Sequence, residues 1–359
     1  MRKFLKIAGI VIGAVLGLAV IYVAYVFISY HRIDDNQDLT VDAPRSGKDT
    51  GSVTTGQIYS AMSYNIGFGA YLPDYSFFMD GGDSSWAKSQ ESVYEALNIA
   101  AKNITDKDPD FVLLQEVDYD STRSYHVNQY NFMKNRLWNY ESAMAIDYDS
   151  AFLMYPFYKP HGKSISSLGL FSKYEISSSV RRKLPISTGF SKLLDLDRCY
   201  SVSRIPVDNG KELVIFTVHL SAYGGSDEIR SAQTGMLTDN MQEEYDKGNY
   251  VICGGDFNHD LKADEADTSE CESWAYPFPR SVLSENFSFA MDFLTENERE
   301  NLWNSARNAD IAYDPDESYT VTLDGFIISD NITLCSYENI ETGYSASDHD
   351  PVYMTFMLN

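Results

Sequence analysis

The stretch Val251–Asp260, VICGGDFNHD, joins a short apolar run to a cluster of polar side chains. An unbroken apolar run of this length, ended by two glycines, is typical of a strand that is buried on both faces. Cys253 lies in this run and is expected to be a buried thiol. Asp256 and Asn258 are two residues apart, so in an extended backbone both side chains point to the same face. The stretch therefore predicts a buried strand that brings an acid and an amide to one place.

Similar apolar runs occur on both sides of this stretch. They are FVLLQEVD (111–118), LGLFSKYEIS (168–177), KELVIFTVHLS (211–221) and TLDGFIIS (322–329). Between them, residues 84–104 and 229–244 have the apolar spacing of helices, and Asp108 and Pro109 end the first of these. This order predicts one α/β domain of about 300 residues, a size compatible with two packed sheets covered by helices.

Residues Ile7 to Ile28 form an uncharged apolar segment. At about 1.5 Å per residue it spans roughly 33 Å, which is enough to cross the core of a bilayer. Basic residues precede the segment and acidic residues follow it, so the positive-inside rule places the N-terminus in the cytoplasm and the rest of the chain outside. We expect an uncleaved anchor; a cleaved signal peptide is the alternative, although no convincing small-x-small site follows the segment.

The next residues differ sharply in composition. Residues 31–55 are rich in Asp, Thr, Gly and Ser and have no apolar periodicity, which predicts a flexible linker. We therefore expect three parts: a membrane anchor over residues 1–30, a linker over 31–55, and a globular catalytic domain over 56–359.

The chain is strongly acidic, with 52 Asp and Glu against 28 Lys and Arg and a formal charge of −24. Such a surface repels polyanions, and nucleic-acid binding depends on Lys and Arg. A nucleic acid is therefore a disfavoured partner, although bound metal ions change the local sign of a site. The four cysteines have neither CxxC nor zinc-site spacing, and one disulfide among Cys199, Cys271 and Cys335 is compatible with the sequence.

Polar residues end several of the apolar runs. They are Glu116, His219, Asp256, Asn258, Asp324 and the pair Asp348–His349. Taken singly, such an acid is more often a turn former and such a histidine a structural residue; the ordered set is what favours a site at the strand ends. Carboxylate and amide oxygens suit Mg²⁺, which polarises a phosphoryl oxygen while a carboxylate or histidine orients the attacking water. The set predicts phosphate-ester hydrolysis, with Asp324 as a candidate partner that holds the tautomer of His349.

The set resembles the endonuclease/exonuclease/phosphatase family. The matching stretches, in the family's order from about residue 58 to the C-terminus, are MSYNIG, LLQEVD, TVHLS, GGDFNHD, TLDGFII and SDHDPV. The resemblance implies an α/β fold, a four-layer α/β/β/α sandwich of two mixed β-sheets. It also implies a metal site with Glu116 as the principal Mg²⁺ ligand and Asn65 and Asp348 near the ion, with Mn²⁺ as an alternative.

The same resemblance implies roles for the remaining polar residues. Asp256 would activate or orient the water, and Asn258 would stabilise the transition state. Asp324 and His349 would form a dyad at the scissile phosphate. His219 would contact phosphate or protonate the leaving group. No position that the family requires is missing from the chain, which argues against a catalytically silent relative.

Loops set the substrate in this family, and two of them contain candidate substrate-binding residues. Arg123 and Tyr125, in the loop after Glu116, could reach a phosphate and line a pocket; the alternative is an ordinary polar loop. Trp274, in SWAYPFPR, could pack on a substrate or a lipid surface; the alternative is that its aromatic neighbours fasten a long loop to the core. No stretch matches the extra signatures expected of an inositol phosphatase or an abasic-site endonuclease.

These observations predict a single-pass membrane enzyme whose catalytic domain lies outside the cell. It would hydrolyse a small or lipid-linked phosphate ester as a phosphodiesterase or phosphatase. An extracellular nuclease is the first alternative, and plasmid cleavage that falls steeply with salt would favour it. A non-catalytic surface-binding domain is the second, and a lost catalytic position would have indicated it.

Overall fold

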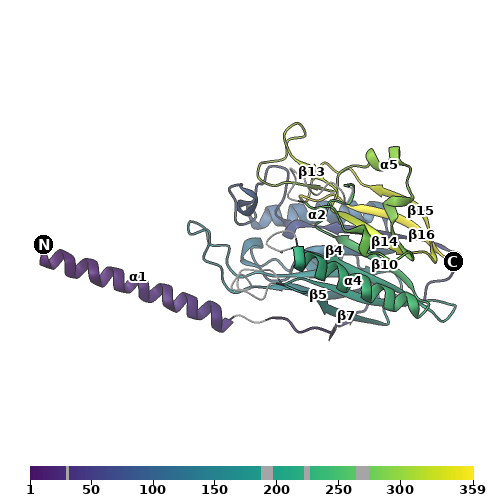
Figure 1. The fold of residues 1–359 in the computed structure, drawn as a ribbon, viewed down its shortest axis with the longest axis horizontal. Coiled ribbons are helices and arrows are strands. Elements are labelled where there is room, and N and C mark those ends of the chain that lie inside the picture. Colours follow the sequence, from purple (N-terminus) through teal and green to yellow (C-terminus); the bar gives the residue numbers. More distant parts are fainter. Residues whose placement is uncertain (30–31, 187–196, 222–226, 264–274) are drawn as a thin grey trace.

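Two seven-stranded mixed β-sheets form the body of the protein (Figure 1). The computed structural model describes residues 1–29, 32–186, 197–221, 227–263 and 275–359. In spatial order, the first sheet consists of β1 (Gln37–Asp38), β7 (Ser178–Lys183), β8 (Cys199–Pro206), β9 (Glu212–His219), β10 (Tyr250–Asp256), β14 (Asp324–Ser329) and β11 (Phe287–Phe289). The second consists of β15 (Ile332–Asn339), β16 (Val352–Leu358), β3 (Ile58–Asn65), β4 (Phe111–Asp118), β6 (Ile165–Ser172), β5 (Glu141–Asp149) and β2 (Val41–Asp42). A small separate sheet pairs β12 (Ala306–Arg307) with β13 (Thr320–Val321).

Helices cover the outer faces of the two sheets. Helices α2 (Gln90–Lys107) and α3 (Gln129–Arg136) lie on the second sheet, and α4 (Asp227–Asp246) lies on the first. The other short helices in the described ranges are η1 (Gly67–Gly69), η2 (Phe78–Asp80), η3 (Thr122–Ser124), η6 (Arg280–Val282), η7 (Ala290–Phe293) and α5 (Glu296–Glu300). The order of layers is helix, sheet, sheet, helix, which confirms the fold expected from the sequence.

Strand β4 shows why its sequence is apolar without alternation. Phe111 and Leu113 belong to the core between the two sheets, together with Phe216 of β9. Val112 and Leu114 point the other way, into the core beneath α2. Because successive side chains of a strand point to opposite faces, a strand between two cores needs apolar residues at every position.

Helix α2 lies close to the range predicted from its apolar spacing. It begins at Gln90 rather than at residue 84, because the Ser89 side chain accepts a hydrogen bond from the Ser92 backbone and forms a capping box. It ends at Lys107, and the C-cap residue Asp108, whose φ of 46° is left-handed, stops the helix before Pro109. The predicted breaker residues therefore act as expected.

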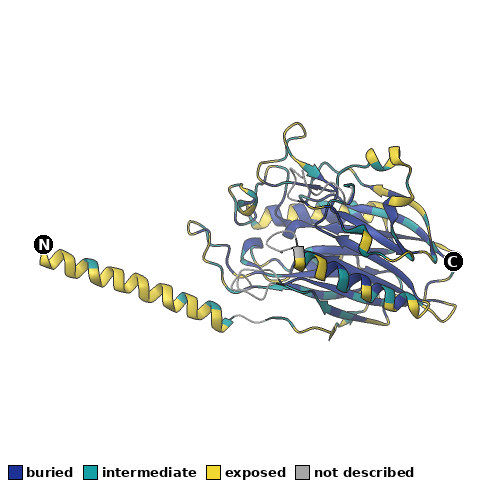
Figure 2. Cartoon of the chain, viewed as in Figure 1, coloured by how far each residue is buried: buried dark blue, intermediate teal, exposed yellow. Residues whose placement is uncertain are grey.

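Helix α1 (Arg2–Ser29) projects from the domain and has no buried residue (Figure 2). Its length and composition are sufficient to cross a membrane, and a signal sequence would satisfy the same test. The following segment, expected to be a flexible linker, contains β1 and β2. These short strands pair with β7 and β5 at the edges of the two sheets. Backbone pairing therefore fixes residues 37–42 to the domain. Because such pairing does not require apolar side chains, the sequence has no periodic pattern there.

Candidate active site

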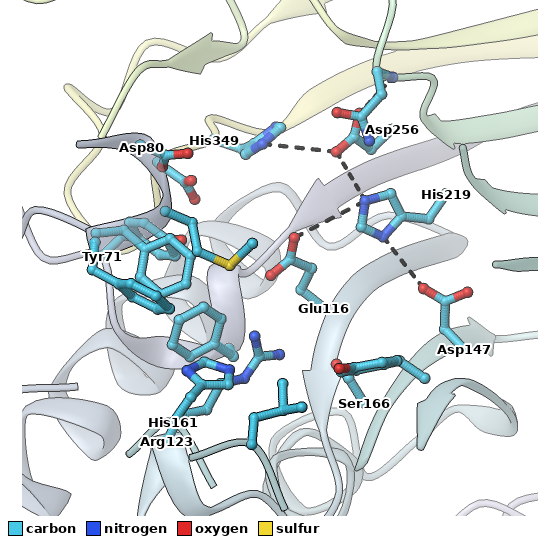
Figure 3. Close-up of a pocket in the computed structure, with 18 of the residues that line it drawn as sticks. Tyr71, Asp80, Glu116, Arg123, Asp147, His161, Ser166, His219, Asp256 and His349 are labelled. Atoms are coloured by element: carbon cyan, nitrogen blue, oxygen red, sulfur yellow. Dashed lines mark hydrogen bonds and ion pairs between the residues drawn. The ribbon is translucent and has the colours of Figure 1, made fainter. Parts of the chain in front are cut away.

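Strand pairing brings the polar strand ends to one edge of the sandwich. β9 and β10 are parallel, and His219 is paired with Asp256. β14 is antiparallel to β10 and begins at Asp324, opposite Asp256. β3 and β4 are also parallel, and the segment before β16 reaches the same edge with Asp348 and His349. A cavity of about 770 Å³ lies there (Figure 3). Its polar lining includes Glu116, His219, Asp256, Asn258, Asp348 and His349.

Two backbone features position the acids of this cavity. Gly255 has a φ of 153°, and a Cβ at this residue would lie 2.0 Å from the Val218 carbonyl oxygen, so only glycine fits between β10 and β9. Glu116 has a φ of 53° beside an irregularity in the pairing of β4 with β6. A bulge redirects a side chain, and positive φ is strained for a residue with a Cβ. The fold therefore holds Glu116 in an orientation that its own backbone preference would not select.

His349 is held by a carboxylate. Its Nδ1 lies 2.7 Å from Oδ2 of Asp324, an oxygen that also accepts a hydrogen bond of 2.7 Å from Oγ of Ser305. Its Nε2 lies 3.7 Å from Oδ2 of Asp256. Burial lowers the pKa of His349, but the carboxylates of Asp324 and Asp256 outweigh burial and raise it well above its usual value. The ring is therefore an imidazolium at neutral pH, and Asp324 is the partner that the sequence suggested.

Asp256 lies at the centre of the site. Its Oδ2 accepts a hydrogen bond of 3.0 Å from Nδ2 of Asn65, and its Oδ1 accepts one of 2.8 Å from the backbone N–H of Asn258. Burial raises the pKa of Asp256 to about 7, and the positive charge of His349 opposes this rise. Two hydrogen bonds thus fix the carboxylate, and its pKa lies in the range that suits a general base.

The reasoning that placed Asp256 and Asn258 on one face is wrong in its geometry. The backbone is not extended at Asn258, which has a φ of 51°, because the turn that follows β10 begins there. Both side chains still line the cavity. One N–H of the Asn258 amide is directed to the Leu220 carbonyl, at 2.8 Å. Asn65, expected near the metal, uses its amide to contact Asp256 and the backbone N–H of Gly67.

His219 is held by an arginine. Nη1 of Arg198 lies 2.9 Å from Nδ1 and 3.0 Å from Nε2 of His219. Nη1 also contacts Oδ2 of Asp147 at 3.2 Å, and that oxygen lies 3.6 Å from Nδ1 of His219. A guanidinium only donates hydrogen bonds, and a neutral imidazole has one unprotonated nitrogen, so only one of these two contacts can be a hydrogen bond in either tautomer. Burial, followed by the charge of Arg198, lowers the pKa of His219 well below its usual value. The ring is therefore neutral at neutral pH.

Two groups of side chains fit a cation. Asp348 is buried, and burial raises its pKa to about 6, with a further contribution from the nearby negative charge of Glu116. Such crowding of carboxylates is relieved by a cation with hard oxygen ligands. Asp256, Asp324 and His349 also bring ligand atoms within 4.8 Å of one another. In that second group, however, His349 is already hydrogen-bonded to Asp324.

Three buried arginines line the same cavity, in contrast to the acidic chain as a whole. Arg123 donates to both oxygens of Asp118 at 3.1 and 2.9 Å, and its guanidinium lies 3.8 Å from the centre of the Phe68 ring. Arg198 contacts His219, and Arg307 donates to nearby backbone carbonyls. All three are at least nine-tenths buried and belong to the cavity lining. Their positive charges offset part of the negative charge of the acids in the same lining, which favours the approach of an anion beside them.

Sequence reasoning selected Arg123 but missed Arg198, Arg307 and Asp147. Arg198 lies just before β8 and Asp147 lies within β5, so neither follows an apolar run in a recognisable motif. Arg307 lies in the short strand β12, which has no periodic signal. The sequence around these three residues has no motif, and their burial in one cavity could be seen only with the fold.

The other substrate-binding predictions have different outcomes. Tyr125 donates from its hydroxyl to the Lys88 carbonyl and packs edge-on against Trp86, and it is not among the residues that line the cavity. Trp274 and Cys271 lie outside the described residues. Nearby, Phe278 is buried in the core, as the loop-fastening alternative expects. Cys199, Cys253 and Cys335 are free thiols, and Cys253 is buried as predicted.

The fold and site together define a phosphoesterase-type α/β/β/α sandwich. The profile of the Endonuclease/Exonuclease/phosphatase family matches residues 62–315, and the chain belongs to this family. Members of the family are hydrolases that act on phosphate esters. No curated protein sequence matches the chain.

Solved structures share this fold. An endonuclease/exonuclease/phosphatase from Beutenbergia cavernae is 16% identical with a TM-score of 0.59, covering 84% of this chain and 72% of its own. The human Nocturnin catalytic domain with bound sulfate is 18% identical with a TM-score of 0.56, covering 88% and 99%. A mannosyl-6-phosphatase from Bacteroides thetaiotaomicron is 17% identical with a TM-score of 0.54, covering 84% and 100%. At such identities the likeness concerns the fold and not the substrate.

Proposed function

We propose that this protein hydrolyses a phosphate ester with the help of a divalent cation, Mg²⁺ or Mn²⁺, outside the cytoplasm. One observation carries the proposal: residues from both sheets meet in one cavity that combines buried acids, a cationic histidine and three buried arginines. The acids suit a cation and a water molecule, and the positive groups suit a phosphate. An ordinary core would not bury so many charges in one place.

The proposed roles follow from the hydrogen bonds. Glu116 and Asp348 would hold the cation, which polarises the phosphoryl oxygen when bound. Asp256, fixed by Asn65 and the Asn258 backbone, would accept the proton of the attacking water. The water oxygen then forms a bond to phosphorus, the bond from phosphorus to the ester oxygen breaks, and the ester oxygen leaves with the electron pair.

The two histidines would act differently on the phosphate. The imidazolium of His349, held by Asp324, would stabilise negative charge on the phosphoryl oxygens. Neutral His219 would contact the phosphate rather than protonate the leaving group, because its lowered pKa leaves the ring without an acidic imidazolium proton at neutral pH. The remaining N–H of the Asn258 amide would donate to the transition state, as the sequence suggested.

The location of the activity rests on α1. Basic residues at its start and acidic residues after its end favour a domain outside the cytoplasm. The formal charge of −24 disfavours a long polyanion, since the three arginines lie inside a cavity and not along a surface groove. A small or lipid-linked phosphate ester is therefore preferred over a nucleic acid.

The test is hydrolysis of bis-p-nitrophenyl phosphate and p-nitrophenyl phosphate by the full chain in detergent micelles. Mg²⁺ should support turnover, and EDTA should abolish it. Glu116→Ala and His349→Ala should each lose most of the activity. Glu95→Ala and His126→Ala are matched controls at exposed positions of the same domain and should keep it. Preference for the diester or the monoester separates a phosphodiesterase from a phosphatase.

Two results would overturn the proposal. Turnover that survives both EDTA and Glu116→Ala would exclude the cation site. No turnover of small, lipid or nucleic-acid esters, with Mg²⁺ bound, would favour a surface-binding domain.

A further inference from the structure

The segment from Phe152 to Tyr158, hereafter the aromatic loop, exposes large apolar side chains. Phe157 is 81% exposed, Tyr158 is 73% exposed and Tyr155 is 64% exposed. Among the described residues outside α1, Phe157 and Tyr158 are the most exposed large apolar side chains. Residues 151–163 contain no Asp or Glu, although the chain has 52 of them. Contiguous exposed apolar surface of this kind marks an interaction site.

The aromatic loop is hydrogen-bonded to the end of α1. The Tyr22 hydroxyl donates to the Phe152 carbonyl and accepts from the backbone N–H of Met154, both at 3.1 Å. The Tyr25 hydroxyl accepts from the backbone N–H of Phe152, also at 3.1 Å. Tyr22 lies seven residues before Ser29 in α1, or about 10 Å along the helix axis. A bilayer that encloses α1 would therefore meet the loop at the depth where tyrosine side chains concentrate.

The same loop forms one wall of the active-site cavity. Leu153, Met154, Tyr155 and Phe157 line the cavity together with Tyr22 of α1. Phe77, Phe78 and Met79 line it as well, and the Phe78 ring lies 5.8 Å from the Tyr155 ring. The cavity thus has a polar part at Asp256 and His349 and an apolar part that reaches the membrane helix. A ligand that fills both parts has a phosphate at one end and an apolar chain at the other.

We propose that the aromatic loop inserts into the interfacial layer of the bilayer that holds α1, and that the substrate is an amphiphilic phosphate ester drawn from that bilayer. Its phosphate reaches Asp256 and its apolar chain passes along Tyr155 and Phe157. The chemistry rests on the proposed function, whereas the docking of the loop does not. Burial of aromatic side chains drives the docking, because the acidic domain gains nothing from attraction to anionic lipids.

The position of the loop can be measured without catalysis. The full chain is placed in nanodiscs of zwitterionic lipid with or without bromine on the acyl chains, and Phe157→Trp is compared with Phe293→Trp. Phe293 is 58% exposed on η7, which contacts β15 at the end of the domain opposite α1 (Figure 1). We expect the fluorescence added by Phe157→Trp to fall at least about twofold in brominated discs, since interfacial indoles lie near the labelled chains.

The control should show no such fall. Equal fluorescence with and without bromine for Phe157→Trp would overturn the docking, as would equal quenching of both variants. A loop covered by a second protein copy would give the first of these results.

The substrate class is tested with two esters that share one reacting centre. Ethyl p-nitrophenyl phosphate is soluble in water, and hexadecyl p-nitrophenyl phosphate enters the nanodisc. We expect the parent chain to prefer the hexadecyl ester by at least about tenfold in kcat/KM, because the apolar wall binds its chain. Phe152→Ser and Tyr158→Ser change loop residues that do not line the cavity. They should reduce turnover of the hexadecyl ester and leave the ethyl ester unchanged.

The outcomes separate the two proposals. Turnover of the ethyl ester with no preference for the hexadecyl ester would overturn the amphiphile and leave the proposed function standing. If neither ester nor the monoester p-nitrophenyl phosphate is turned over, the result counts against the proposed function, and the quenching experiment still decides the docking.

Discussion

The two buried histidines of the active site lie on either side of Asp256, and their pKa values shift in opposite directions. His349 contacts the carboxylate of Asp324, and its pKa is raised. His219 contacts the guanidinium of Arg198, and its pKa is lowered. Burial acts on both rings in the same direction, because it disfavours the charged form. The neighbouring charge therefore decides which histidine is cationic.

The opposite charge states give His349 and His219 different roles. A cationic ring at His349 can stabilise a phosphoryl oxygen, and a neutral ring at His219 can make a hydrogen bond without adding charge. Figure 3 shows Asp256 between the two rings. Its Oδ2 lies 3.7 Å from Nε2 of His349 and 3.4 Å from Nε2 of His219. The opposite charge states of the two rings can be tested by substitutions at Asp256, at the partner residue of either ring, and at a histidine outside the reacting groups.

The largest effect on kcat is expected at Asp256, which lies close to both histidine rings. Asp256→Asn keeps the size of the side chain and removes the proton acceptor, so kcat should fall by about 10³-fold or more. Steady-state hydrolysis of bis-p-nitrophenyl phosphate with Mg²⁺ measures this. Asp239→Asn, an exposed position on α4, is the matched control and should have no effect. A loss smaller than about tenfold would mean that another group accepts the proton.

The next effect is expected on the His349 side. Asp324→Asn should lower kcat by about 10²-fold, because the pKa of His349 falls when its carboxylate partner is removed. His349 must be protonated, so activity should be lost at a lower pH on the alkaline side of the profile. A profile of kcat against pH measures the shift. Asp147→Asn, the equivalent change beside His219, should not move the alkaline limb of the profile. An unmoved alkaline limb for Asp324→Asn would contradict the conclusion that Asp324 raises the pKa of His349.

The His349 side could largely be predicted from the sequence, and the His219 side could not. Asp324, Asp348 and His349 flank short apolar strands, and strand ends meet where the sheet places them. Arg198 and Asp147 reach His219 only because the start of β8 lies beside an irregular part of β5, a strand of the other sheet. Such packing between sheets leaves no local pattern in the sequence.

The fold shows the same division. Continuous apolar runs predicted strands such as β4 and β10, because burial on both faces acts on every residue. The short strands β1 and β2 were not predicted, since backbone pairing alone holds them. The turn at Asn258 and the strained φ of Glu116 were also missed, because tertiary contacts override local preference at such positions.

A smaller effect is expected on the His219 side. Burial and then the charge of Arg198 lower the pKa of His219. Arg198→Gln removes the second of these causes, so the ring becomes protonated at a higher pH than in the parent. We expect kcat/KM to fall by up to about tenfold on the acid side of the profile, where the ring becomes protonated, and by less at pH 9. Profiles of kcat/KM against pH measure this. Arg198→Lys keeps the charge and should restore the acid side of the profile. A loss that is the same at every pH would mean that Arg198 acts only by binding phosphate.

The smallest effect concerns stability and a third histidine of the cavity. His161 is buried, its Nδ1 lies 3.0 Å from the Ser85 carbonyl, and burial and then the charge of Arg123 lower its pKa to about 4. Protonation therefore favours the unfolded chain, so this contribution is complete above about pH 6.5 and is lost as the pH falls toward 4. His161→Asn keeps a donor for Ser85 and does not titrate.

Between pH 7 and pH 5 the parent should lose about 2 kcal/mol more unfolding free energy than His161→Asn. Urea unfolding of both chains in mild detergent at the two pH values measures the difference, in which the other titrating groups cancel. His161 has burial without a carboxylate partner, so it should behave like His219 and unlike His349. Equal losses in the two chains would show that His161 is protonated in the folded protein, and that burial does not keep a ring neutral in this cavity.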